Sequence, residues 1–185
     1  MNAPVLEDGV IALDAHTLAD VVAHVAGEDD EQARRFGWYP RRSTEETAAA
    51  AIEAWQAQCA AGGPRRTFAI RELPGRALAG GCELRLEGDG RAALSYWTFP
   101  AFRGRGFATR AVRLVTGWAF AHLEVARVEL LIEPDNHASL AVARRAGFIR
   151  EGVLRAHTSV GDRRADMVSW SRVLPSDPTE QETTT

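Results

Sequence analysis

The break at Gly62-Gly63-Pro64 separates two parts of the chain that differ in hydrophobic periodicity. Before the break, apolar residues recur at helical spacing, whereas three strand-like runs follow directly after it. Glycine and proline at this point end a helix, because neither residue propagates helical backbone well. The chain must therefore combine N-terminal helices with a sheet, which favours an α/β or α+β fold.

The order of the predicted elements specifies the fold class further. A short strand and the N-terminal helices are followed by an antiparallel meander, then a helix, a strand, a helix and a closing hairpin. The expected strands are 10–13, 67–71, 77–86, 92–97, 128–132, 148–154 and 165–173. The expected helices are 14–27, 43–61, 106–122 and 136–146. This order predicts a mixed, mostly antiparallel sheet of six to seven strands with helices on both faces.

Polar side chains mark two of the expected helix starts. Asp14 is a candidate N-cap for the first helix, and Ser43 with Glu46 has the spacing of a capping box for the second. We expect residues 1–174 to form a single domain. The Pro/Thr/Glu-rich segment 175–185 has the composition of a disordered tail.

The charged residues exclude several kinds of chemistry. All 22 basic residues are arginine, so neither a Schiff-base lysine nor the lysine of a phosphate-binding P-loop is available. The two cysteines, Cys59 and Cys82, are too few for a disulfide framework or a Cys-rich zinc site. The five histidines lack metal-ligand spacing, so no metal is expected.

The distribution of charge and hydrophobicity bears on partners and location. The net charge of −3 disfavours nucleic acid as a partner, although residues 65–174 are rich in arginine and residues 1–64 are acidic. No apolar run has the length of a membrane span, and no secretory signal pattern begins the chain. We therefore expect a soluble, cytoplasmic protein with no membrane partner.

The segment from Arg103 to Ala108 has the chemistry of an anion-binding loop. Gly104 and Gly106 allow a sharp turn and close approach of the backbone to a ligand, directly before a long amphipathic helix. The N-terminus of that helix adds partial positive charge, and Arg103 and Arg105 add charged donors for phosphate oxygens. A glycine loop that only begins a helix, with two solvated arginines, is the alternative reading of this segment alone.

Several short motifs accompany this loop at family-specific distances. They are Ser95-Tyr96-Trp97, Arg103-Gly104-Arg105-Gly106-Phe107-Ala108, Asn136-His137-Ala138-Ser139, Arg145-Ala146-Gly147-Phe148 and Glu151-Gly152. Together they resemble the GNAT acetyltransferase superfamily, in particular its RimJ/RimL-like branch, over residues 8–174. The resemblance implies an acetyl-CoA-dependent N-acetyltransferase in which a primary amine attacks the thioester directly. It also implies a splay between two central parallel strands, here those that end near Trp97 and Ile132.

The resemblance assigns a cofactor site to this splay. The pyrophosphate of acetyl-CoA would lie on the backbone amides of the loop, and the pantetheine arm would lie between the splayed strands. A backbone N–H near Trp97 or Thr98 would stabilise the oxyanion. The implied cofactor-binding residues are Trp97, Thr98, Arg103, Gly104, Arg105, Gly106, Phe107, Ala108 and Asn136.

The proton-transfer groups are less well matched to the family. Many relatives carry glutamate where this chain has Ala93. The remaining candidates for the base are Glu83 on the neighbouring strand, His157, or a water chain that reaches either of them. The tyrosine that several GNAT enzymes use as the acid corresponds to Ala143 here. Ser139 is the better candidate for the acid, with Tyr96 as a less favoured one.

Three readings of the function stay open, two of which differ in the acceptor. The RimJ/RimL-like resemblance favours a protein N-terminus, whereas the acidic run Glu28 to Glu31 would suit an aminoglycoside or a small polyamine. Trp38 and Tyr39 are candidates for a wall of the acceptor pocket. The departures at Ala93 and Ala143 also permit an inactive CoA-binding sensor. A homodimer is compatible with the sequence, but no surface for it is specified.

Overall fold

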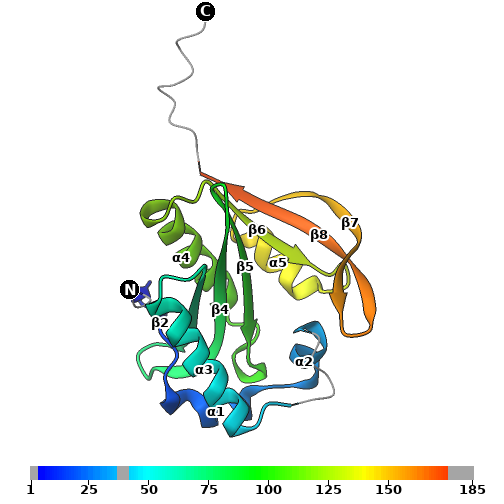
Figure 1. Cartoon of the computed structure of the whole chain (residues 1–185). Coiled ribbons are helices and arrows are strands. Elements are labelled where there is room, and N and C mark those ends of the chain that lie inside the picture. The colour runs from blue at the N-terminus through cyan, green and yellow to red at the C-terminus, as the bar shows by residue number, and fades with distance from the viewer. Residues whose placement is uncertain (1–3, 37–41, 175–185) are drawn as a thin grey trace, which may run out of the picture.

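The computed structural model describes residues 4–36 and 42–174. One eight-stranded sheet runs through this part of the chain in the order β1-β2-β3-β4-β5-β6-β8-β7 (Figure 1). The strands are β1 (Leu6–Glu7), β2 (Ile11–Asp14), β3 (Arg65–Glu72), β4 (Ala77–Gly88), β5 (Arg91–Thr98), β6 (Arg127–Ile132), β7 (Ile149–Val160) and β8 (Arg163–Val173). The α-helices are α1 (Val21–Gly27), α2 (Asp30–Phe36), α3 (Glu45–Ala60), α4 (Phe107–His122) and α5 (His137–Arg145). Two 3₁₀ turns, η1 (Leu18–Asp20) and η2 (Pro100–Phe102), complete the described elements.

The mixed, mostly antiparallel sheet predicted from the sequence is confirmed, with one strand more than the predicted maximum of seven. The additional strand is β1, which pairs with β2 over only two residues and is too short to show a periodic pattern. The tail 175–185 and the pair Trp38 and Tyr39 lie outside the described residues.

Both predicted helix caps differ from those observed. Asp14 ends β2, where its carboxylate binds Arg71, and Thr17 begins the following helical segment. At α3 the capping box is formed by Thr44 and Thr47, one residue later than predicted. Ser43 is unavailable for the cap because its amide and hydroxyl donate to Glu28.

The helices pack on opposite faces of the sheet, as the alternation of side chains along the strands requires. Phe68 and Ile70 of β3 point into the main core with the apolar face of α4 and with Ala143 of α5. The other face carries α1 and α3, which contact β4 and β3 and pack together around Ile52 (Figure 1). Cys59 and Cys82 are both buried, as expected of small core side chains.

The centre of the sheet opens between its only described parallel strands. The pairing of β5 with β6 includes Arg91, Ala92 and Ala93 but none of the later residues of β5. The two strands therefore diverge toward Thr98 and Ile132, as predicted for the splay. Glycine at positions 80 and 81 of β4 accommodates the end of β5, because a Cβ at Gly81 would lie 2.3 Å from the Trp97 indole.

A buried ion cluster attaches the start of α1 to the sheet. Arg71 of β3 donates to Asp14 at 2.7 Å and to both carboxylate oxygens of Asp20 at 2.8 and 2.9 Å. These hydrogen bonds outweigh the effect of burial, which alone would raise the pKa of Asp20, and hold that pKa below its ordinary value. Within the described ranges, no helix is both long and apolar enough to cross a membrane.

Candidate active site

A cavity of about 700 Å³ lies where β5 and β6 diverge. Its walls come from the end of β5, the loop before α4, the first turns of α4 and α5, and the helix α2. The lining residues include Glu31, Gln32, Arg35, Phe36, Tyr96, Trp97, Thr98, Arg103, Gly104, Arg105, Gly106, Phe107, Ala108, Asn136 and Ser139. The cavity therefore brings together the predicted cofactor residues and Ser139.

The loop before α4 has the backbone of an anion-binding turn. Gly104 and Gly106 adopt φ values of +74° and +81°, and Gly106 is the N-cap residue of α4. No other group lies within 4 Å of the position where a Cβ would extend from either glycine. The first N–H groups of an α-helix have no intrahelical acceptor, so the start of α4 presents donors to an anion in the cavity.

The two arginines of the loop bind carboxylates in this structure. The guanidinium of Arg103 donates to both oxygens of Asp29, at 2.7 and 3.0 Å, and its Nε donates to the Thr98 carbonyl at 3.0 Å. Arg105 pairs with Glu72 and lies 4.8 Å from the centroid of the Phe107 ring. For either arginine to bind phosphate, it would have to exchange a carboxylate for the phosphate.

The start of α5 forms the opposite wall. The side-chain oxygen of Asn136 accepts from the backbone N–H of Ser139 at 3.1 Å, so Asn136 caps this helix. The Tyr96 hydroxyl donates to the Ser139 carbonyl at 3.4 Å, and burial raises the pKa of Tyr96 to about 12. The phenol is therefore protonated at neutral pH, and two hydroxyl groups lie on this wall.

The two predicted candidates for the base do not line the cavity. Glu83 pairs with Arg65, with 3.3 Å between guanidinium nitrogen and carboxylate oxygen. His157 lies on the exposed part of β7, where its Nδ1 is 2.9 Å from the Thr158 hydroxyl. The carboxylate of Glu83 is held by Arg65, although Glu83 pairs with Ser95 of β5, and His157 lies on the exposed part of the β7–β8 hairpin.

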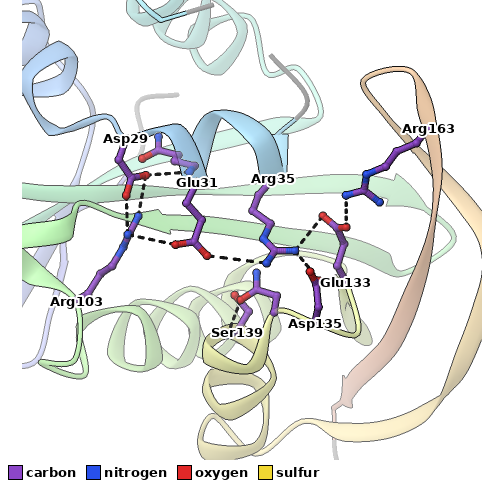
Figure 2. Close-up of polar contacts among 10 residues, drawn as sticks. Asp29, Glu31, Arg35, Arg103, Glu133, Asp135, Ser139 and Arg163 are labelled. Carbon is purple, nitrogen blue, oxygen red and sulfur yellow. Dashed lines mark hydrogen bonds and ion pairs between the residues drawn. The ribbon is translucent and has the colours of Figure 1, made fainter. Parts of the chain in front are cut away.

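Helix α2 crosses the cavity and is the part of the site that the sequence analysis did not predict. Figure 2 shows it between the loop before α4 and the start of α5. Arg35 of α2 binds Asp135 at 2.6 Å and Glu133 at 3.5 Å, and Arg163 of the closing hairpin binds Glu133 as well. The local signal for this helix is Asp29, whose carboxylate accepts from the Gln32 amide at 2.9 Å.

Every carboxylate of the acidic run Glu28 to Glu31, which extends into the first turn of α2, has a polar partner. Glu28 binds His24 and Ser43, Asp29 binds Arg103, and Asp30 binds Arg42. Glu31 lies 3.6 Å from Arg103 and 3.9 Å from Arg35. These carboxylates therefore join elements together and do not form an unpaired anionic surface. No group of three or more His, Cys, Asp or Glu side chains among residues 4–36 and 42–174 is arranged to hold a metal ion.

The splayed sheet and the glycine loop at a helix N-terminus are the features that the family resemblance predicted. Residues 11–149 match the model of the acetyltransferase (GNAT) domain, and the chain belongs to this family. The resemblance noted from the sequence is thereby confirmed.

Individual relatives and structures agree with this assignment. The Bacillus subtilis (strain 168) protein named "Probable N-acetyltransferase YjcK" is 38% identical over 69 residues, which are 37% of this chain and 38% of the relative. The spermidine N(1)-acetyltransferase of Escherichia coli (strain K12) is 31% identical over 64 residues, 35% of this chain and 34% of the relative. The chain thus spans less than half the length of these curated relatives. The chain has the same fold as RimL, a ribosomal L7/L12 alpha-N-protein acetyltransferase solved in complex with coenzyme A. The TM-score is 0.83 at 18% sequence identity, and the match covers 94% of this chain and 100% of RimL.

Proposed function

We propose that this GNAT enzyme uses acetyl-CoA to acetylate a primary amine, with a protein N-terminus as the favoured acceptor. The observation that carries the proposal is the cavity at the splay. The positive-φ glycines and the start of α4 line this cavity together with the other predicted cofactor residues. Exposed backbone donors at a helix N-terminus fit a pyrophosphate. The cavity volume of about 700 Å³ fits a pantetheine arm together with an acceptor.

Each wall of the cavity has a separate role in this proposal. The backbone amides of residues 103–108 and the side chain of Asn136 bind acetyl-CoA, which supplies the thioester carbonyl. Backbone N–H near Trp97 and Thr98 stabilises charge on the carbonyl oxygen. The hydroxyl of Ser139 protonates the departing sulfur, and Tyr96 keeps the wall in place through its hydrogen bond to the Ser139 carbonyl.

Two classes of acceptor have support. The similarity of fold to RimL supports a protein N-terminus, and the sequence match to the spermidine acetyltransferase supports a small polyamine. Helix α2 favours a protein N-terminus as the acceptor, because the side chains that it adds to the cavity wall include Arg35 and Gln32 as well as Glu31. A small polycation is better matched by a wall that carries only carboxylates.

The test follows thiol release from acetyl-CoA by the purified chain. Peptides with N-terminal Ser or Ala are compared with aminoglycosides and polyamines, with blanks that contain no amine. We expect turnover that is selective for peptides. Turnover that is selective for polyamines or aminoglycosides would overturn the protein N-terminus as the acceptor and make that amine class the acceptor. Tight binding of acetyl-CoA without turnover of any amine would indicate a CoA-binding sensor and overturn the proposed activity.

A further inference from the structure

Two buried histidines lie directly behind the Trp97 wall of the cavity. The ring centroids of His16 and His24 are 6.0 and 6.2 Å from that of Trp97, and Trp55 of α3 and Phe99 complete the enclosure. His16 and His24 are only 2% and 7% exposed. A single indole therefore separates this pair from the cavity.

The two histidines differ in what they bind. Nε2 of His24 lies 3.3 Å from a carboxylate oxygen of Glu28, and Glu28 also accepts from the amide and the hydroxyl of Ser43 at 3.0 and 2.7 Å. Both nitrogens of His16 lack a hydrogen-bond partner among the described residues. Burial, reinforced by its neighbour His24, lowers the pKa of His16 to about 3, so His16 is a neutral imidazole.

Glu28 determines which nitrogen of His24 is available. Burial alone would raise the pKa of Glu28, but the hydrogen bonds from His24 and Ser43 outweigh it and hold that pKa below its ordinary value. An ionised carboxylate at Nε2 selects the tautomer with the proton on Nε2. The lone pair then lies on Nδ1, which is buried and has no partner in the described part of the chain.

Unpaired polar atoms also occur on the neighbouring cavity wall. The Oε1 of Gln32, the Nε1 of Trp97 and the hydroxyl of Thr98 are buried without a partner in the described ranges, and all three residues line the cavity. Gln32 is only 5% exposed. Buried groups of this kind are normally satisfied by ordered water or by a ligand. They provide hydrogen-bonding positions on the cavity wall that includes Trp97, the residue against which His24 packs.

We infer that the His24–Glu28 pair is the proton acceptor for the acceptor amine, acting through hydrogen-bonded water beside Trp97. The inference rests on the proposed acetyltransferase function. It supplies the base that Glu83 and His157 do not supply, and it explains how the chain can carry alanine at position 93.

The proton balance of the step is complete. As the amine nitrogen bonds to the thioester carbonyl carbon, an N–H bond breaks and its proton passes through water to Nδ1 of His24. The C–S bond then breaks, and the sulfur takes a proton from the hydroxyl of Ser139. Solvent returns a proton from His24 to Ser139, which leaves an amide and the free thiol of CoA. Glu28 and His16 are the titratable groups that face His24, and its other ring neighbours are Trp55, Trp97 and Phe99.

The test measures kcat/KM against pH with an amine that the wild-type chain acetylates. For His24→Gln we expect kcat to fall about 10²-fold at pH 7, because positioned proton transfer contributes at least that factor. For Glu28→Gln we expect the acidic limb of the profile to move to lower pH, since the protonated imidazole then lacks the carboxylate that lies beside it. A role in packing alone would not move that limb, and the pKa of the amine itself is unaffected by either change.

His16→Gln is the matched control, because it alters the same enclosure at a ring that has no carboxylate. We expect this variant to keep the position of the acidic limb, and all variants to keep the acetyl-CoA Kd. Thermal unfolding checks each variant, and Glu28→Gln, which preserves shape, decides the outcome if His24→Gln does not fold. An unmoved limb in Glu28→Gln, or the same loss of kcat in His16→Gln as in His24→Gln, would overturn the inference while leaving the acetyltransferase function intact. Absence of turnover by the wild type with every amine would overturn both.

Discussion

The two sides of the cavity are built in different ways. On the side that we propose for the cofactor (the cofactor side), the loop 103–108 runs directly into α4, and Asn136 caps the helix that also carries Ser139. On the side that we propose for the acceptor (the acceptor side), α2 is held by ion pairs that bring together residues far apart in the sequence, such as Arg35 with Asp135 and Arg103 with Asp29 (Figure 2). One side is therefore made of consecutive backbone, and the other of side chains brought together by folding.

This difference has consequences for specificity. Backbone donors at a helix start are fixed by the helix itself and suit a cofactor that never changes. Partly exposed ion pairs contribute only about 0–1 kcal/mol each. A helix held by such ion pairs tolerates substitution without loss of the fold. We therefore expect relatives with different acceptors to differ in sequence mainly on the acceptor side.

The buried cluster around Arg71 attaches the start of α1 to the sheet, unlike the partly exposed ion pairs of α2, and its removal should have the largest effect. We expect Arg71→Met to lower the free energy of unfolding by about 3–5 kcal/mol, because Asp14 and Asp20 lose their buried partner. Urea unfolding followed by tryptophan fluorescence measures this loss. Arg76→Met is the control, since this half-exposed arginine binds the same Asp14 and should contribute at most about 1 kcal/mol.

The pH dependence of this difference has a definite sign. Folding lowers the pKa of Asp20, so the ionised Asp20 carboxylate adds to the free energy of unfolding at pH values above its unfolded pKa of about 3.9. This stabilisation disappears as the pH falls through the pKa of Asp20 in the folded chain. The gap between wild type and Arg71→Met should therefore narrow below about pH 4. Equal losses for the two arginine variants would show that burial does not distinguish them.

Ser139→Ala tests whether the chemistry belongs to the cofactor side. We expect kcat to fall about 10²-fold, or about 2.7 kcal/mol, with an unchanged acetyl-CoA Kd, because only the proton for the sulfur is lost. Tyr96→Phe is the comparison, since it keeps the ring and removes the second hydroxyl of the same wall. A larger loss of kcat in Tyr96→Phe would transfer the role of the acid to Tyr96.

Gly106→Val tests the backbone of the loop. The φ of +81° at Gly106 strains a β-branched residue by about 1–3 kcal/mol, so we expect acetyl-CoA to bind about tenfold more weakly in calorimetry. Gly117→Val changes an exposed glycine in the middle of the same helix. It should raise stability slightly, because valine has a higher helix propensity than glycine, without altering the Kd. An unchanged Kd in Gly106→Val would remove this turn from the cofactor site.

The contrast between the two sides also explains what sequence reasoning could reach. The loop 103–108, the start of the helix at Asn136 and the meander are local patterns, and the structure has them at the predicted positions within a few residues. The splay followed from the family resemblance. The strand β1 and the ion pairs of α2 depend on partners across the fold, so no local pattern could specify them.

Some of the missed features did leave a local trace. Asp29 three residues before Gln32 is an N-cap spacing, and it was hidden inside an acidic run that suggested a charged surface. His24 and Glu28 have the i,i+4 spacing of residues that meet on a helix. Their burial, which makes the pair a candidate for proton transfer, arises from Trp55 and Trp97 and is visible only in the folded chain.

Asp29→Asn addresses a contact that links the two sides, and its effect should be the smallest. Asp29 holds the guanidinium of Arg103 in a two-point contact, and an exposed pair of this kind contributes about 0.2–1 kcal/mol. Release of Arg103 should tighten acetyl-CoA binding by up to about fivefold and make the Kd more sensitive to salt, because one more cation is free for the pyrophosphate. Asp30→Asn is the matched control, because its partner Arg42 does not line the cavity. Weaker binding in Asp29→Asn would mean instead that the ion pair positions Arg103 for the cofactor, and that the acceptor side helps to build the cofactor side.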